Sequence, residues 1–304
     1  MRFSLAETAS FLSSYHGHPP PLLRRVATAL RFAADGRRRR IAWLVGDSSL
    51  DNKYWLSSPT QRPANGLDAV LAPGTRVPPD IAQLLNEALE GGGAFACVNC
   101  AVEESTLASR AGGRLLAHDE VVRDLIEDGD AIIVSVGGND VALAPSVATI
   151  ASLCSVLKRP CPPSASAIES GAVLGISHLD RMFGDAQRDY VASILSPRGK
   201  VPSLVAFSMI YYPLMRAGGS WADAALQLLG YDADPRPLQL LIRSVFERVT
   251  SRIELPGVKT VGCPLYEVLD AEDPDDFVAR VEPSAAGGRK MAAAFAKLLF
   301  DRAV

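Results

Sequence analysis

Five short, continuous apolar runs constrain the fold of this chain more than any other feature of its sequence. They span residues 41–48, 94–102, 131–140, 203–212 and 258–267. A strand with one solvated face alternates apolar and polar residues, whereas a strand covered on both faces reads as an unbroken apolar run. The five runs therefore predict a parallel sheet that is buried on both faces.

Helical patterns separate these runs. Apolar residues recur with helical spacing over residues 81–89, 238–249 and 291–302. The alternation of strands and helices predicts right-handed crossovers and a three-layer α/β/α sandwich with a five-stranded parallel sheet of flavodoxin-like type. We interpret residues 1–40 as an N-terminal helical extension and residues 41–304 as the α/β domain.

Charge and composition narrow the classes of partner. The net charge of −3 gives no reason to expect a nucleic-acid partner or a membrane surface. No stretch approaches the roughly 18 apolar residues of a membrane span, and the N-terminus lacks the pattern of a secretory signal. Five cysteines, odd in number and thinly spread, favour a reducing compartment. We expect a cytoplasmic protein, with an organellar transit segment as the alternative, and nothing in the sequence indicates an oligomeric state.

Cys97 and Cys100 form a C-x-x-C pair at the end of an apolar run. A zinc site of this kind needs a second pair of ligands, and none accompanies it in the sequence. We interpret the two residues as structural thiols. The sequence predicts no metal and no cofactor.

Small and polar residues follow three of the predicted strands, as Gly-Asp-Ser-Ser (46–49), Asn-Cys-Ala (99–101) and Gly-Gly-Asn-Asp (137–140). Ligands of open parallel sheets bind beyond the carboxyl ends of the strands. Glycine allows a tight turn that exposes a serine hydroxyl, and Asn139 can direct an amide donor at a developing oxyanion. The three clusters are therefore the candidate site.

Taken together and in this order, GDSSLDN at 46–52 and VSVGGND at 134–140 resemble the GDSL, or SGNH, hydrolase family. The resemblance covers residues 41–300. It implies that Ser48 is the nucleophile and that the Ala101 N–H and the Asn139 side chain belong to the oxyanion hole. The family usually has glycine at the position of Ala101, where this chain keeps the backbone donor. The implied substrate is a small-molecule ester or acyl compound.

The last block of that family reads Asp-x-x-His-Pro-Ser. Here Pro283 and Ser284 align, but Glu282 stands at the histidine position and Ala279 at the aspartate position. We interpret Glu282 as a site residue, in first place as an atypical base, with a proton relay or a substrate-binding carboxylate as other roles in the site. Burial would raise its pKa and a nearby helix N-terminus would lower it, and the sequence leaves open which effect prevails. An anionic helix cap without a catalytic role is the alternative.

Other residues near these blocks receive simpler interpretations. His178 is the alternative base, Asp47 is expected to fix the loop geometry, and Lys53 is interpreted as a solvated lysine. Four aromatic residues are expected to line a substrate cleft or to belong to the core: Trp55, Tyr211, Tyr212 and Trp221.

Three functions are compatible with this sequence. The leading hypothesis is an SGNH-type esterase or acyl transferase that forms an acyl-enzyme on Ser48. The second is a catalytically silent protein that uses the same fold to bind an anion or acyl group. The third is a lyase-type enzyme in which Glu282 removes a proton from the substrate.

Overall fold

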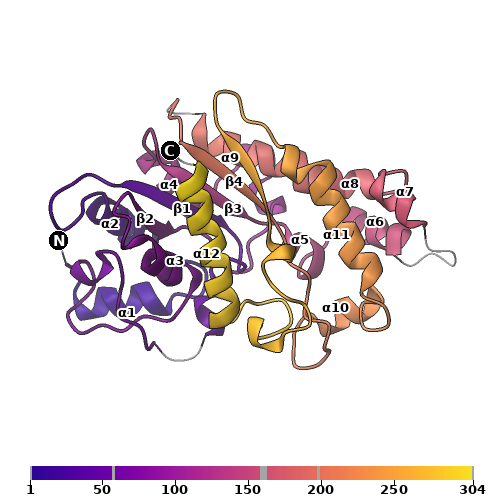
Figure 1. The fold of residues 1–304 in the computed structure, drawn as a ribbon, viewed down its shortest axis with the longest axis horizontal. Coiled ribbons are helices and arrows are strands. Elements are labelled where there is room, and N and C mark those ends of the chain that lie inside the picture. Colours follow the sequence, from indigo (N-terminus) through magenta and orange to yellow (C-terminus); the bar gives the residue numbers. More distant parts are fainter. Residues whose placement is uncertain (1, 57–58, 158–162, 197–198, 303–304) are drawn as a thin grey trace.

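A single all-parallel sheet organises the chain (Figure 1). The computed structural model describes residues 2–56, 59–157, 163–196 and 199–302. The strand order is β2-β1-β3-β4-β5, which is the flavodoxin-like order. The strands coincide with the five predicted apolar runs: β1 Arg40–Gly46, β2 Phe95–Asn99, β3 Ala131–Ser135, β4 Leu204–Met209 and β5 Thr260–Pro264.

Both faces of the sheet are buried along β1 to β4, whereas the edge strand β5 is partly exposed. In β1, Ile41, Trp43 and Val45 enter one hydrophobic cluster, Ala42 and Leu44 enter another, and all five are fully buried. Because successive side chains of a strand point to opposite faces, a sheet covered on both faces requires apolar residues at every position. The predicted three-layer α/β/α fold with a five-stranded parallel sheet is confirmed.

Two groups of helices provide the outer layers. On one face, α3 (Ile81–Leu89) and α12 (Ala285–Arg302) pack against each other and against the strands. The other face is covered by α2 (Pro20–Leu30), α4 (Ala117–Leu125) and α9 (Gln187–Leu195). Every described helix is too short or too polar to span a membrane.

Further helices lie on the side of the molecule away from α1 and α2 (Figure 1). They interrupt the crossovers that follow β3 and β4, and α11 packs on α7. Part of the predicted insertion at 141–200, at 158–162 and 197–198, lies outside the described residues. These helices are α5 Gly138–Ala142, α6 Val147–Leu157, α7 Ala165–Glu169, α8 Ile176–Arg181, α10 Asp223–Leu228 and α11 Arg236–Arg248.

The N-terminal residues form α1 (Leu5–Ser13) and then α2. A capping box begins α1, in which Ser4 Oγ accepts from the Glu7 N–H and Glu7 Oε2 accepts from the Ser4 N–H. Leu23 of α2 is fully buried and belongs to the same hydrophobic cluster as β1. The division of the chain at residue 40 stays a prediction.

Candidate active site

The ends of β1, β2 and β3 meet at one edge of the sheet. In the strand register, Leu44 lies opposite Asn99 and Gly46 lies opposite Ser135. Parallel pairing therefore places the first polar block directly beside the second and third. The residues that follow these strands share a single region, as the carboxyl-end rule predicts.

Gly46 makes the turn after β1 possible. Its φ of +138° is rare for residues with a side chain, and a Cβ there would lie 1.8 Å from the Ser135 carbonyl oxygen. Asp47 then closes the turn: Oδ1 accepts from Ser49, and Oδ2 accepts from the Gly137 N–H at 3.1 Å. The expectation that Asp47 fixes the loop geometry is confirmed, because its carboxyl group connects the first block to the third.

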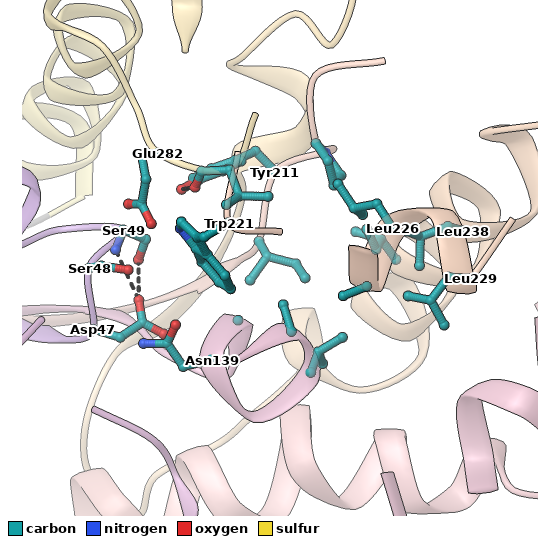
Figure 2. A pocket seen from close by; sticks show the side chains of 18 residues that line it. Asp47, Ser48, Ser49, Asn139, Tyr211, Trp221, Leu226, Leu229, Leu238 and Glu282 are labelled. Atoms are coloured by element: carbon teal, nitrogen blue, oxygen red, sulfur yellow. Dashed lines mark hydrogen bonds between the residues drawn. The ribbon is translucent and has the colours of Figure 1, made fainter. Parts of the chain in front are cut away.

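The two serines of the turn have different environments. Ser49 Oγ donates to Asp47 Oδ1 at 2.7 Å and lies 2.7 Å from Ser135 Oγ, so its hydroxyl is occupied. Both serines line a cavity, and within it Ser48 faces Glu282 (Figure 2). Of the two hydroxyls, that of Ser48 is placed to react with a molecule in the cavity.

Asn139 lies in the first turn of α5 and also lines this cavity. Its Nδ2 donates to the Ser105 carbonyl oxygen at 3.0 Å, which orients the amide. An asparagine Nδ2 carries two hydrogens, and this bond uses one of them. Gly137, which precedes α5, has a φ of +117° and donates its N–H to Asp47.

Ala101 is placed differently from the other candidate residues. Its N–H donates to the Asn99 side-chain oxygen at 3.0 Å, and Ala101 is not among the residues that line the cavity. The structure therefore brings Ser48, Asn139 and Glu282 to one cavity and leaves Ala101 outside it, with its backbone donor already used.

A short loop before α12 carries Glu282. The Val278 N–H donates to the Glu282 carbonyl oxygen at 2.9 Å, and Phe277 bridges to Pro283. Outside the loop, Tyr211 Oη donates to the Val281 carbonyl oxygen at 2.6 Å, and Asn52 Nδ2 donates to that of Pro283 at 3.1 Å. Asn52 thereby ties the first block to the last.

Ser284 caps α12. Its Oγ accepts from the backbone N–H groups of Ala286 and Gly287 at 3.0 and 3.1 Å. Glu282 lies before this cap and is only 1% exposed, with its side chain turned into the cavity. The alternative that Glu282 serves as the helix cap is therefore wrong.

Burial dominates the electrostatics of Glu282. Loss of solvation raises the pKa of Glu282 well above 4.5, the negative charges of Glu103 and Asp47 raise it further, and hydrogen bonding by Trp221 and Ser48 acts in the opposite direction. One carboxyl oxygen, Oε2, is buried without a hydrogen-bond partner. Of the two effects that the sequence left open, burial prevails.

Glu103 and Asp47 are the carboxyl groups that act on Glu282. Burial raises the pKa of Asp47 to about 6 and that of Glu103 to about 7, against the hydrogen bonds that both accept. Glu103 accepts from Trp55 Nε1 at 3.1 Å, and its Oε2 is also buried without a partner. Three neighbouring carboxyl groups at the site, those of Asp47, Glu103 and Glu282, thus have raised pKa values.

Lys53 departs from its predicted state. It is buried and forms an ion pair with Asp51, so the interpretation as a solvated lysine is wrong. Asp51 is held in turn by the N–H groups of Gly17 at 2.9 Å and Glu103 at 3.0 Å. A lysine amine can be buried when a carboxylate such as Asp51 pairs with it, and the residue type alone does not reveal such a partner.

None of the four histidines lines the cavity that contains Ser48. His178, the alternative base, lies in a different pocket with Nε2 3.0 Å from Thr149 Oγ1. His18 is buried against Phe11, and His16 approaches the Glu103 carbonyl oxygen. The residues that line the Ser48 cavity include no histidine. In the described part of the chain, no group of three or more His, Cys, Asp or Glu side chains is arranged to hold a metal ion.

The remainder of the cavity is apolar (Figure 2). Two of the four aromatic residues, Tyr211 and Trp221, line it, whereas Trp55 contacts Glu103 and Tyr212 stacks on Tyr266. The sequence pattern missed the contribution of α10, where no helix was predicted, and of α11, whose apolar stripe is typical of ordinary helix core. The cavity is lined there by Ala225 and Leu226 of α10, by Leu229 just after α10, and by Leu238 and Ile242 of α11.

The sequence matches no protein-family model and no curated protein. Among solved structures it is similar to YXIM_BACsu from Bacillus subtilis, with 14% identity, a TM-score of 0.39, and 88% of this chain and 58% of that chain covered. A variant of an acetyl xylan esterase from Geobacillus stearothermophilus gives 12% identity, a TM-score of 0.42, and coverage of 88% and 95%. A candidate SGNH hydrolase from Slackia heliotrinireducens gives 13% identity and a TM-score of 0.38, with 86% of this chain and 98% of that chain covered. The chain therefore spans less than two thirds of the Bacillus protein, and at these identities the likeness concerns the fold alone.

Proposed function

We propose that this protein is a serine hydrolase or acyl transferase that acts on an ester, with Ser48 as nucleophile and Glu282 as base. The observation that carries the proposal is the pairing of the Ser48 hydroxyl with a buried carboxyl group in one cavity. A carboxylate whose pKa is raised toward the operating pH is a stronger base than a solvated carboxylate. Burial of Glu282 thus compensates in part for the missing imidazole.

The reaction follows from these groups. Ionised Glu282 takes the Ser48 proton while Oγ forms a bond to the ester carbonyl carbon. The free Nδ2 hydrogen of Asn139 donates to the oxyanion, an interaction that typically contributes about 3–4 kcal/mol to transition-state stabilisation. The C–O bond to the alcohol then breaks, and the alcohol leaves with the proton from Glu282. Water, or a second alcohol in a transferase, attacks the acyl-Ser48 ester by the same path.

A second candidate is a binding protein of the same fold without hydrolytic activity. Two observations favour it: the Ala101 N–H is occupied by Asn99, and the raised pKa of Glu282 keeps its neutral form populated to higher pH than in an ordinary glutamate. A neutral carboxyl group donates a hydrogen bond to a bound carbonyl oxygen and cannot activate a hydroxyl.

Covalent labelling with a fluorophosphonate, read by intact mass, distinguishes the two. Ser48 Oγ displaces fluoride from phosphorus, so an adduct reports an activated hydroxyl. We expect one adduct on the wild type and on Ser49→Ala, none on Ser48→Ala, and labelling of Glu282→Gln slowed by about 10² or more. Circular dichroism and thermal melting check that each variant is folded.

The matched serines make the result specific. Both serines line the cavity, but Ser49→Ala removes a hydroxyl that is bound to Asp47 and Ser135, whereas Ser48→Ala removes the one that faces Glu282. If folded wild type forms no adduct between about pH 6 and about pH 9, the hydrolase proposal fails and the binding protein replaces it.

A further inference from the structure

Charge and apolar surface are segregated within the Ser48 cavity. Its two acidic lining residues, Asp47 and Glu282, both lie beside Ser48, and the described residues that line it include no lysine, arginine or histidine. Figure 2 shows these groups at one end, leucines of α10 and α11 at the other, and the Trp221 ring between them. A ligand that contacts Ser48 therefore extends toward an aliphatic end.

Most of the aliphatic end is buried, whereas Trp221 borders on solvent. Leu226, Leu238 and Ile242 are at most 6% exposed, and Trp221 is 38% exposed. In an acyl-enzyme the acyl group stays bonded to serine while the alcohol leaves and water enters. The buried end accordingly suits the part of the ester that stays, which is the acyl chain, and the side near Trp221 suits the part that leaves.

The lining also disfavours anionic ligands. A negative charge brought beside Asp47 and Glu282 meets carboxyl groups and no compensating cation. Sulfate, phosphate and acidic esters are thus poor ligands, and a fatty acid formed by hydrolysis would be repelled once it ionises.

We propose that this site takes uncharged esters with an aliphatic acyl chain longer than acetyl, and that α10, α11 and Leu229 set the accepted chain length. This inference rests on the proposed hydrolase function. Each methylene that enters the apolar end contributes about 0.8 kcal/mol, which corresponds to a rise of about fourfold in kcat/KM. The rise stops when the chain reaches the end of the cavity.

Two adjacent leucines supply the test and its control. Leu229 is half-buried and lines the cavity, whereas Leu228 is 57% exposed and does not line it. Hydrolysis of p-nitrophenyl acetate, butyrate and octanoate is compared for wild type, Leu229→Trp and Leu228→Trp. We expect octanoate to exceed acetate by about tenfold or more in wild type, because several methylenes are buried. Leu229→Trp should lower that ratio by about tenfold, and Leu228→Trp should leave it unchanged.

Binding by Ser48→Ala separates this inference from the hydrolase proposal. Titration calorimetry with N-methyloctanamide, a neutral amide without an ester bond, should show binding, and N-methylacetamide and octanoate should bind more weakly by about tenfold or more. Amide binding without any ester hydrolysis by wild type overturns the hydrolase and supports the ligand class. Acetate hydrolysed as fast as octanoate, or a ratio insensitive to Leu229→Trp, overturns the ligand class while the hydrolase stands.

Discussion

Glu282 differs chemically from the imidazole that it replaces. A histidine near pKa 6.5 changes charge close to neutral pH, whereas an ordinary glutamate does so near 4.3. Burial and the neighbouring Glu103 and Asp47 carboxyl groups raise the pKa of Glu282 well above 4.5. The same surroundings therefore make ionised Glu282 a better base and make that ionised form less abundant at neutral pH.

This balance predicts the pH dependence of the reaction. Because the base acts when ionised, the fluorophosphonate labelling rate should rise with pH through the raised pKa of Glu282, with its midpoint well above 4.5. The measurement is the labelling rate against pH. A flat profile, or a midpoint near that of an ordinary carboxylate, would contradict the role of Glu282.

Glu103→Gln serves as the control for this profile. The variant keeps an oxygen that accepts from Trp55 and removes the charge that raises the pKa of Glu282. The midpoint should therefore shift to lower pH without disappearing. If the rise vanishes in Glu103→Gln and persists in Glu282→Gln, the titrating base is Glu103.

At the scale of the elements, the buried side chain of Arg280 connects helix α10 to the loop that carries Glu282. Arg280 has a φ of +53° and a side chain only 1% exposed. Its Nε donates to the Leu214 carbonyl oxygen, Nη1 to Asp223 at 2.9 Å and Nη2 to Asp232 at 2.8 Å. Arg280 thus acts as a positioning residue that joins the Glu282 loop to the side of the cavity formed by α10.

Replacing this arginine should loosen both elements. We expect Arg280→Met to lower the free energy of unfolding by about 1–3 kcal/mol, a modest figure because Asp223 and Asp232 are about one third exposed and regain solvent. Urea denaturation measures this loss. Arg243→Met, which removes exposed pairs with Glu169 and Glu247, should change it by less than about 1 kcal/mol. Equal effects of the two substitutions would show that Arg280 is not a fastening point.

At this scale the sequence predicted what periodicity and order can encode. The β1 run and the turn at Ser48 were predictable because a buried strand must be apolar and must end before polar residues. The position of Ala101 outside the cavity was not predictable, because the hydrogen-bond partner of its N–H depends on the rotamer of Asn99. The burial of Lys53 was not predictable either, because it depends on Asp51 and on Gly17, which is far away in the sequence. The stripe of α11 predicted a buried face but not that Leu238 borders a cavity.

For the molecule as a whole, the decisive connection is between the N-terminal helices and the site. The Gly17 N–H donates to Asp51, which also accepts from the Glu103 N–H. Leu23 of α2 is fully buried and shares a hydrophobic cluster with β1. Because these contacts reach both the sheet and the carboxyl groups of the site, we expect residues 1–40 to unfold together with the rest of the chain.

Leu23→Ala tests this expectation. Loss of a buried leucine side chain should lower the free energy of unfolding by about 2–5 kcal/mol, and Leu5→Ala, at a position 77% exposed, should change it by less than about 0.5 kcal/mol. If the chain is one cooperative unit, circular dichroism and fluorophosphonate labelling of Leu23→Ala should be lost at the same urea concentration. If residues 1–40 form a separate unit, labelling should persist after a first transition has unfolded α1 and α2. That result would place the boundary near residue 40 and make the contacts of Gly17 dispensable for the site.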